Sequence, residues 1–331
     1  MSIALHIIQP GALTTVQDAG RQAAVRFGVP RGGAMDQFAL VAANRLVGNP
    51  PDAAVLELTA GGASLVSLRF QALALTGADL GATLNGRAVR PWTTVLTRPG
   101  DRLQLAMRQE AWGARAYLAV SGGLATPPVL GSRSTNLASG FGGLAGRSLR
   151  AGDQLVAAPP WCEPQRVVGR TWPVDQRPAY GSCPSLRFVP GPHAPLFDPA
   201  CFAPQALPPL TVAMSSNRMG YRLEGCHLPT LQPLSLASLG VIPGVIQVPP
   251  DGSPILLMAD AQTTGGYPIF GVVIAADLPL AAQLLPGDQL RLEPITVEAA
   301  LVARQTMATW EAIPLSEPAS VVALGLAGAL A

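Results

Sequence analysis

The sequence contains no lysine. All 22 basic residues are arginine, which excludes a Schiff-base lysine, a catalytic lysine and the phosphate-binding lysine of a Walker A loop. A biotin attached to this chain is excluded as well, because the carrier motif needs a lysine. If the protein uses ATP, the nucleotide must be held in another way or shared with a partner.

Charge is scarce throughout the chain. Only 13% of the residues are charged and the formal net charge is +2, with the arginines scattered among acids. No basic tract indicates nucleic acid or an anionic membrane surface. No apolar run reaches the ~20 residues of a membrane span, and the apolar residues 3–8 are typical of a strand rather than of a signal peptide. We therefore expect a cytoplasmic protein without nucleic-acid or membrane partners.

Cysteine and histidine are also few. The four cysteines form no CxxC pair, and the three histidines lie far apart. Cys226 and His227 are adjacent, but neighbours on a strand point to opposite faces, which disfavours zinc. We predict no metal site and four reduced, mostly packed thiols.

Glycine and proline are abundant instead, with 35 and 33 residues, and 49% of the chain is hydrophobic. Such a composition predicts a full core, many turns and short strands. Period-2 alternation recurs, as in residues 289–293. Helical patterns are confined to Asp36–Val47, Val297–Trp310 and a short stretch after Asp277. The sequence predicts a mainly β protein with few helices.

A Pro-rich stretch divides the chain. Residues 159–184 predict a linker between a first domain, 1–158, and a second, 185–312, followed by a C-terminal tail, 313–331. A Gly-Asp turn before a strand occurs in both halves, at residues 99–103, 151–155 and 286–290. It indicates either a common turn or two related β-barrels that share a hairpin.

Four Gly-rich segments combine polar side chains with arginine: residues 14–36, 130–147, 215–220 and 259–268. Glycine lets backbone N–H groups approach a ligand, and arginine offers a planar fork for carboxylate or phosphate. The pattern favours a small, polar, anionic substrate. No GxSxG, HExxH or strand-linked GxGxxG motif is present, so a self-contained nucleophile is not indicated.

These segments, in order, resemble a known family. The matching stretches include TTVQDAGR (residues 14–21), GVPRGGAMD (28–36), LGSRST (130–135), SSNRMGYRLEG (215–225) and QTTGGYP (262–268). The chain is similar to the carboxyltransferase-like family that holds the C subunit of 5-oxoprolinase, KipA, allophanate hydrolase subunit 2 and the urea carboxylase carboxyltransferase region. The resemblance implies two cyclophilin-like β-barrel domains with a cleft between them.

The resemblance also implies an activity. The expected function is that of the C subunit of an ATP-dependent 5-oxoprolinase, a lactam hydrolase that opens 5-oxo-L-proline to L-glutamate and is inactive without its subunit-B-like (KipI-like) and subunit-A-like partners. ATP would be shared with a partner subunit. The alternatives are a biotin-dependent carboxyltransferase of the urea type and a KipA-like, non-catalytic protein that binds a kinase inhibitor. The last is suggested by Asn217, Leu239 and Ala261, where the family pattern has Asp, an acidic residue and Arg.

The predicted site faces a cleft between the two domains. Asp18 and Asp36 are the catalytic candidates. The candidates for binding substrate or phosphate are Arg21, Arg133, Thr135, Arg147, Asn217, Arg218, Gln262, Thr263, Thr264 and Tyr267. The alternative is that the arginines pair with Asp18, Asp36, Asp153 or Asp260 inside their own domains.

Overall fold

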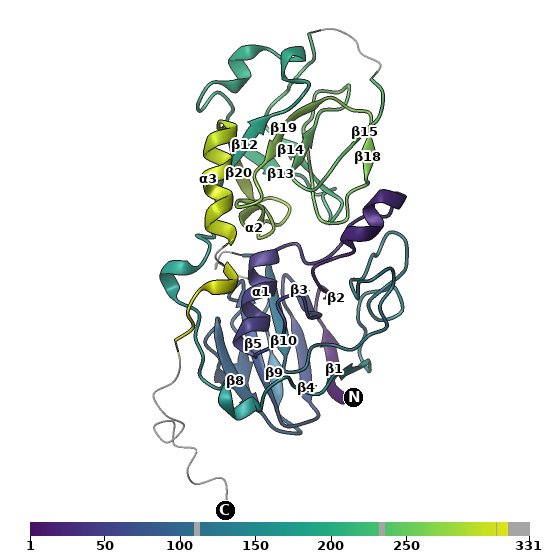
Figure 1. The fold of residues 1–331 in the computed structure, drawn as a ribbon, viewed down its shortest axis with the longest axis vertical. Helices are drawn as coiled ribbons and strands as arrows, with labels where there is room; N and C mark the ends of the chain where they lie inside the picture. Colours follow the sequence, from purple (N-terminus) through teal and green to yellow (C-terminus); the bar gives the residue numbers. More distant parts are fainter. Residues whose placement is uncertain (109–112, 232–235, 309, 317–331) are drawn as a thin grey trace, which may run out of the picture.

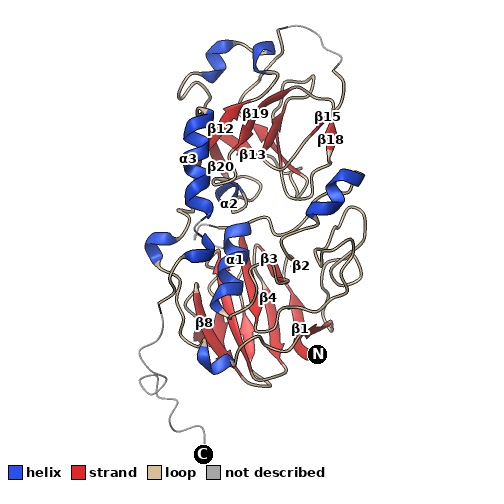
Figure 2. Cartoon of the chain, in the orientation of Figure 1, coloured by secondary structure: helices blue, strands red, loops and turns tan. Residues whose placement is uncertain are grey.

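The strands fall into two groups that are stacked along the long axis of the molecule (Figure 1). The fold comes from a computed structural model, which describes residues 1–108, 113–231, 236–308 and 310–316. Strands dominate and the helices are few (Figure 2), so the predicted mainly β class is confirmed. One group is a closed barrel and the other consists of open sheets. The cyclophilin-like character of the two domains stays a prediction.

The first group holds two antiparallel sheets. The six-stranded sheet has the order β11-β1-β4-β9-β6-β7 and is built from β1 (Ser2–Pro10), β4 (Ala63–Ser67), β6 (Thr83–Leu84), β7 (Arg87–Ala88), β9 (Arg102–Gln104) and β11 (Gln154–Ala157). The five-stranded sheet has the order β2-β3-β10-β5-β8 and is built from β2 (Leu13–Gln17), β3 (Val55–Thr59), β5 (Gln71–Gly77), β8 (Thr93–Thr97) and β10 (Arg115–Val120).

The second group is a closed seven-stranded barrel of order β12-β19-β16-β17-β14-β13-β20. Its strands are β12 (Ser185–Pro190), β13 (Leu210–Val212), β14 (Gly220–Glu224), β16 (Val245–Gln247), β17 (Ile255–Leu257), β19 (Ile269–Val273) and β20 (Gln289–Pro294). Among the strand pairs described in this barrel, only β12 and β20 run parallel, and their pairing closes the barrel. A separate two-stranded sheet joins β15 (Leu239–Gly240) and β18 (Thr264–Gly265).

Helices cover the sheets without forming a layer of their own. They are α1 (Gln37–Leu46), α2 (Leu278–Ala281) and α3 (Val297–Ala308), with 3-10 turns η1 (Gln22–Phe27), η2 (Pro164–Arg166), η3 (Val174–Gln176), η4 (Ala194–Leu196), η5 (Pro199–Phe202) and η6 (Trp310–Ala312). In Figure 1, α1 lies beside the five-stranded sheet, α3 runs along the barrel, and α2 lies near the junction of the two groups.

The helices begin where the capping residues predict. The Asp36 carboxylate accepts a hydrogen bond from the Ala39 amide at 2.9 Å at the start of α1, which is the N-cap geometry. Thr296 caps α3 in the same way, through its hydroxyl and the Ala299 amide at 3.2 Å. The predicted third helix is α2, which follows Asp277. Trp310 falls in η6, after the end of α3.

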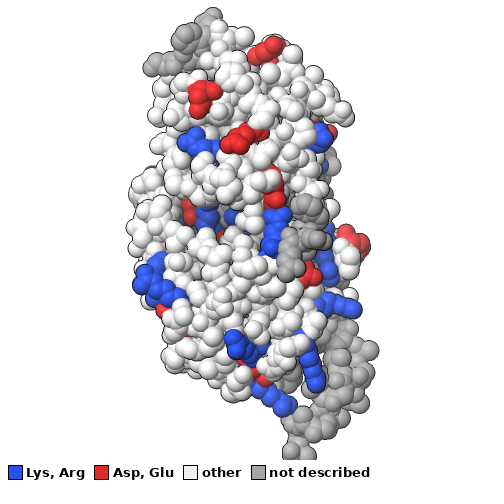
Figure 3. All heavy atoms as spheres, turned by 180° about the vertical axis from the view of Figure 1, so that it is seen from behind, with Lys and Arg blue, Asp and Glu red and all other residues white. Residues whose placement is uncertain are grey.

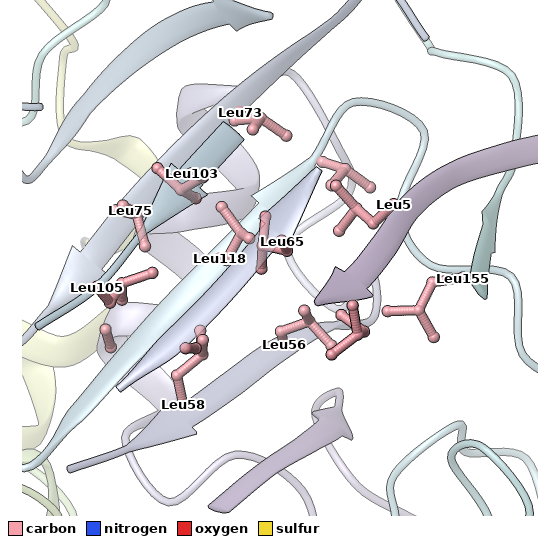
Figure 4. Packing of buried hydrophobic residues seen from close by; sticks show 14 of the residues in the cluster. Leu5, Leu56, Leu58, Leu65, Leu73, Leu75, Leu103, Leu105, Leu118 and Leu155 are labelled. Carbon is pink, nitrogen blue, oxygen red and sulfur yellow. The ribbon is translucent and has the colours of Figure 1, made fainter. Parts of the chain in front are cut away.

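Alternating strands place leucines between the two sheets of the first group. Leu56 and Leu58 on β3 point into this core (Figure 4), where Leu5, Leu65 and Leu118 meet them from neighbouring strands. Inside the barrel the core is richer in aromatic rings; Phe202 and Phe270 stack with their ring centroids 4.5 Å apart. The two cores are separate clusters of buried residues, as expected if each half buries its own apolar surface.

The repeated Gly-Asp turn has one geometry in both halves. The carboxylates of Asp101, Asp153 and Asp288 each accept from the amide three residues earlier, at 2.7 Å. The preceding glycines all have φ between 90° and 94°, a conformation that glycine adopts without strain. The repeated Gly-Asp turn is therefore a local structure that leads the chain into a strand.

The Pro-rich segment packs against the first strand group. Trp172 is fully buried beside α1, and Thr171 forms isolated bridges with Thr93 and Ser316. The predicted domain limits stay a prediction. Of the predicted tail, residues 317–331 lie outside the described residues.

Candidate functional site

Arg218 lies at the junction of the two strand groups and is 6% exposed. Its Nε donates to Asp260 Oδ2 at 2.9 Å, and its Nη1 donates to Glu57 on β3. Its Nη2 donates to the Gly33 carbonyl at 2.6 Å. Burial opposes the charge, but the two carboxylates outweigh it and hold the pKa of the Arg218 guanidinium above its ordinary value. The alternative pairing with Asp260 is confirmed, and the contact with Glu57 also ties the barrel to the sheets.

Arg115 on β10, a strand of the sheets, contacts residues of the barrel. Its Nη1 donates to the Tyr221 hydroxyl at 3.1 Å and to backbone carbonyls just after α2. Its Nε lies 3.9 Å from Glu57 Oε1, and the Arg115 amide donates to the side chain of Gln283 at 2.9 Å. Two buried guanidiniums thus face two buried carboxylates. We call Glu57, Arg115, Arg218 and Asp260 the junction network.

Asp36 is fully buried beside this network. Its Oδ2 accepts from the Tyr180 hydroxyl at 2.6 Å and from Gln283 Nε2 at 2.9 Å. Burial raises the pKa of the Asp36 carboxyl to about 6, although these hydrogen bonds oppose the shift. Asp36 therefore joins α1, the Pro-rich segment and the barrel at a single carboxyl that titrates near neutral pH.

Asp18 organises the turn at residues 132–134. Its carboxylate accepts from the hydroxyls of Ser132, at 2.6 Å, and Ser134, and from the amides of Gly20 and Arg133. Four donors from two segments far apart in the sequence converge on one side chain. This explains physically why the first and second Gly-rich segments are held together.

Arg21 is enclosed by the same turn. It is 1% exposed, donates to the Ser134 carbonyl at 2.6 Å and lies over the ring of Phe141 at 4.8 Å. Burial lowers the pKa of its guanidinium, while Asp18 and Asp260 partly offset this. The position of Gly32 is restricted by the same side chain, because an added Cβ would lie 2.8 Å from Arg21 Nη1.

The remaining first-half candidates also have partners within the protein. Arg133 donates to the Thr126 carbonyl, and the buried Thr135 hydroxyl donates to the Val16 carbonyl at 3.0 Å. Arg147 forms a bidentate pair with Asp153, with both distances 2.8 Å. The alternative that this arginine pairs inside its own half is confirmed. Direct roles of these residues toward a ligand stay predictions.

Three of the second-half candidates meet around one pocket on the barrel. Its volume is about 170 Å³, and its lining is Ser215, Asn217, Met219, Gly220, Arg222, Gln247, Ile255, Leu257, Gln262 and Tyr267. We call it the barrel pocket. Thr264 is exposed on β18. Thr263 is turned toward η1, since an added Cβ at Gly28 would lie 4.0 Å from its hydroxyl.

A second pocket, of about 180 Å³, lies where the two halves meet. Arg31, Gly32 and Gln37 supply its polar rim, and Met258 and Leu278 are among its mostly apolar walls. Among the described residues that line it, none is a candidate named from the sequence. The structure therefore distributes most of the candidates among the turn around Asp18, the contacts of Asp36, the junction network and the barrel pocket, while Arg147 pairs with Asp153 and Thr263 lies near Gly28.

Sequence reasoning missed several residues of these clusters. Glu57 could have been found as a lone acid between Leu56 and Leu58 in an apolar strand, since alternation turns it away from the leucine core. Arg115 offers a similar signal before the apolar run of β10. Gln247 and Gln283 carry no such signal, because an isolated glutamine is unremarkable until its surroundings are known.

The described residues hold no cluster of three or more His, Cys, Asp or Glu side chains arranged to bind a metal ion. The cysteines in this part of the chain are free and half-buried. No described helix has both the length and the apolar character needed to cross a membrane. On the face in Figure 3, charged side chains form small groups of both signs within a mostly uncharged surface.

Residues 27–294 match the family described as carboxyltransferase domain, subdomain A and B. The chain belongs to this family. It is 42% identical over 304 residues to the C subunit of 5-oxoprolinase from Escherichia coli, covering 91% of this chain and 94% of that protein. It is 35% identical over 301 residues to the C subunit of 5-oxoprolinase from Haemophilus influenzae, with the same coverages of 91% and 94%.

A solved structure extends the likeness to a larger protein. The urea amidolyase of K. lactis superposes with a TM-score of 0.85 at 29% identity over 94% of this chain. The match covers 20% of the urea amidolyase chain, so this protein spans about a fifth of that relative.

Proposed function

We propose that this chain is the C subunit of an ATP-dependent 5-oxoprolinase, which opens 5-oxo-L-proline to L-glutamate together with the A and B subunits. One observation carries the proposal: the similarity to the C subunit of 5-oxoprolinase runs through 91% of this chain and 94% of the Escherichia coli protein, at 42% identity. The proposal includes two cyclophilin-like domains and a cytoplasmic location.

A lactam is a stable amide, so its opening needs an activated carbonyl, oriented donors and exclusion of bulk water. ATP would supply the activation by phosphorylating the lactam oxygen. The chain has no lysine to bind a triphosphate, and the four arginines predicted to bind phosphate, Arg21, Arg133, Arg147 and Arg218, all donate hydrogen bonds within the protein. This supports an ATP site shared with, or built by, a partner subunit.

Within this proposal the two catalytic candidates have different tasks. Asp36, with a pKa of about 6, can gain or lose a proton just below neutral pH, and its ionised form accepts the hydrogen bonds of Tyr180 and Gln283. Asp18 holds the turn at residues 132–134 against the segment that follows β2. Neither carboxyl needs a metal ion for these tasks.

Reconstitution tests the proposal. The purified chain is mixed with the A and B subunits, ATP and 5-oxo-L-proline, and glutamate and ADP are measured. We expect both products only when all components are present. The Escherichia coli C subunit in place of this chain is the positive control. If that control produces glutamate and this chain produces none, the proposal is wrong.

The second candidate is a biotin-dependent carboxyltransferase, favoured by the superposition on urea amidolyase. A chain without lysine needs biotin on a separate carrier. Transfer of labelled carboxyl from carboxybiotin to urea by this chain would support that candidate. The KipA-like alternative predicts tight binding of a subunit-B-like partner without either activity, so the same two assays with a pull-down separate all three.

A further inference from the structure

The barrel pocket contains a buried polar group that has no partner. Gln247 ends β16 and is 2% exposed. Its Oε1 accepts from Gln262 Nε2 at 3.2 Å, and in this orientation of the amide Nε2 is the end without a partner. In the part of the chain that the structure describes, this Nε2 finds no hydrogen-bond acceptor. A buried donor without an acceptor is costly, so the pocket is suited to a ligand that brings one.

Glycine leaves room for this amide. A Cβ added at Gly265 on β18 would lie 2.5 Å from Gln247 Nε2. Any other residue at this position would push the amide aside. The glycine of β18 therefore lets the Gln247 amide lie against the backbone of the two-stranded sheet.

The pocket also contains a cation without a carboxylate. Arg222 on β14 lines it, and its guanidinium forms no ion pair among the described residues. The backbone of Arg222 is fixed by the Ser216 hydroxyl, which accepts from its amide at 3.1 Å. None of the described lining residues is acidic. The local charge thus favours an anion.

The walls limit the size and shape of that anion. Ile255, Leu257 and Met219 supply apolar surface, and Tyr267 and Asn217 add polar groups at the edge. A cavity of about 170 Å³ suits a small ligand. A short carbon skeleton with one carboxylate and one carbonyl oxygen satisfies the guanidinium, the free amide and the walls together.

We propose that the barrel pocket binds a small carboxylic acid that carries an amide carbonyl, with Arg222 holding the carboxylate and Gln247 Nε2 donating to the carbonyl. This inference rests on the proposed function, because 5-oxo-L-proline has both groups. It places the substrate on the barrel and leaves the junction network as the structural support of that barrel.

Calorimetric titration of the full chain tests the pocket. The probes are 5-oxo-L-proline, 2-pyrrolidinone, which lacks the carboxylate, and L-proline, which lacks the lactam carbonyl. We expect the first to bind more tightly than either of the others. Arg222→Met should weaken it roughly tenfold or more, and Gln247→Leu roughly three- to tenfold. Arg291→Ala, an exposed strand arginine on the same barrel, is the matched control and should bind normally.

The reconstituted complex separates this inference from the proposed function. We expect Arg222→Met to raise the KM for 5-oxo-L-proline and Arg291→Ala to leave it unchanged. If the wild-type complex makes glutamate and Arg222→Met changes neither KM nor titrated affinity, the pocket assignment is wrong and the function stands. If the wild-type complex makes none while the chain binds the probe through Arg222, the function is wrong and the pocket stands. Absence of binding to the full chain overturns the assignment.

Discussion

Arg218 and Arg222 lie four residues apart, yet their surroundings are opposite. Arg218 is buried in the junction network, between the carboxylates of Glu57 and Asp260. Arg222 is exposed in the barrel pocket, where no described lining residue is acidic. Both lie in the stretch of residues 215–225 that carries the family resemblance, although only Arg218 is named from the sequence as a binding candidate.

The difference teaches how to separate structural from ligand-binding arginines. A guanidinium enclosed with carboxylates has satisfied its charge, and removing it leaves those carboxylates buried and uncompensated. A guanidinium facing an open pocket has its charge available for a ligand, and its removal leaves the fold intact. The junction network should therefore control stability, and the barrel pocket should control binding.

The largest effect is expected from Arg218→Ala. Because Glu57 and Asp260 would remain buried without their counter-ion, the free energy of unfolding should fall by about 3–5 kcal/mol. Urea unfolding monitored by fluorescence measures this. Arg222→Ala from the same segment is the control. A loss below about 1 kcal/mol for Arg218→Ala would show that the junction network is not the support inferred here.

The next effect concerns Asp36 and pH. Its pKa of about 6 in the folded protein lies above the ordinary value of 3.8, so the folded state binds this proton more tightly. The associated stabilisation is complete below about pH 4 and is lost as pH rises through about 6, a change of roughly 3 kcal/mol. Asparagine keeps the N-cap but does not titrate.

Unfolding of wild-type protein and Asp36→Asn between pH 4.5 and 7.5 tests this expectation. The stability difference between the two should shift in favour of the variant as pH rises. Asp52→Asn, at an exposed aspartate, should follow the wild-type slope. A difference that stays constant over this range would contradict the raised pKa of Asp36.

A smaller effect is expected from Arg147→Ala. Its pair with Asp153 is bidentate, but the arginine side chain is 30% exposed, and solvent screens such a pair. The loss of stability should be far smaller than that of Arg218→Ala, measured as a small fall in the urea midpoint. A loss as large as that of Arg218→Ala would remove the distinction drawn between buried and exposed pairs.

The smallest effect on stability is expected from Arg222→Ala. Surface substitutions of this kind usually change the free energy of unfolding by less than about 0.5 kcal/mol. Thermal unfolding without ligand should give an unchanged midpoint, while the increase produced by 5-oxo-L-proline should be reduced. A large loss in the ligand-free protein would make Arg222 structural and remove the contrast with Arg218.

The sequence by itself determined the elements and the family. Alternation of apolar residues predicted short strands, and Asp36 and Thr296 marked the starts of α1 and α3, because strand faces and helix caps depend on neighbours in the chain. The ordered motifs led to the carboxyltransferase domain family for the same reason, since they are continuous stretches of residues.

Only the tertiary structure decided which polar residues share a site. Glu57 and Arg218 are 161 residues apart, and Asp18 reaches Ser132 over 114, so no local pattern could pair them. The surroundings of the Gln247 amide are set by Gln262, which donates to its oxygen, and by Gly265, against which it packs. Burial and long-range pairing determine the protonation and the unused hydrogen-bonding capacity of each group, and these properties arise only in the folded chain.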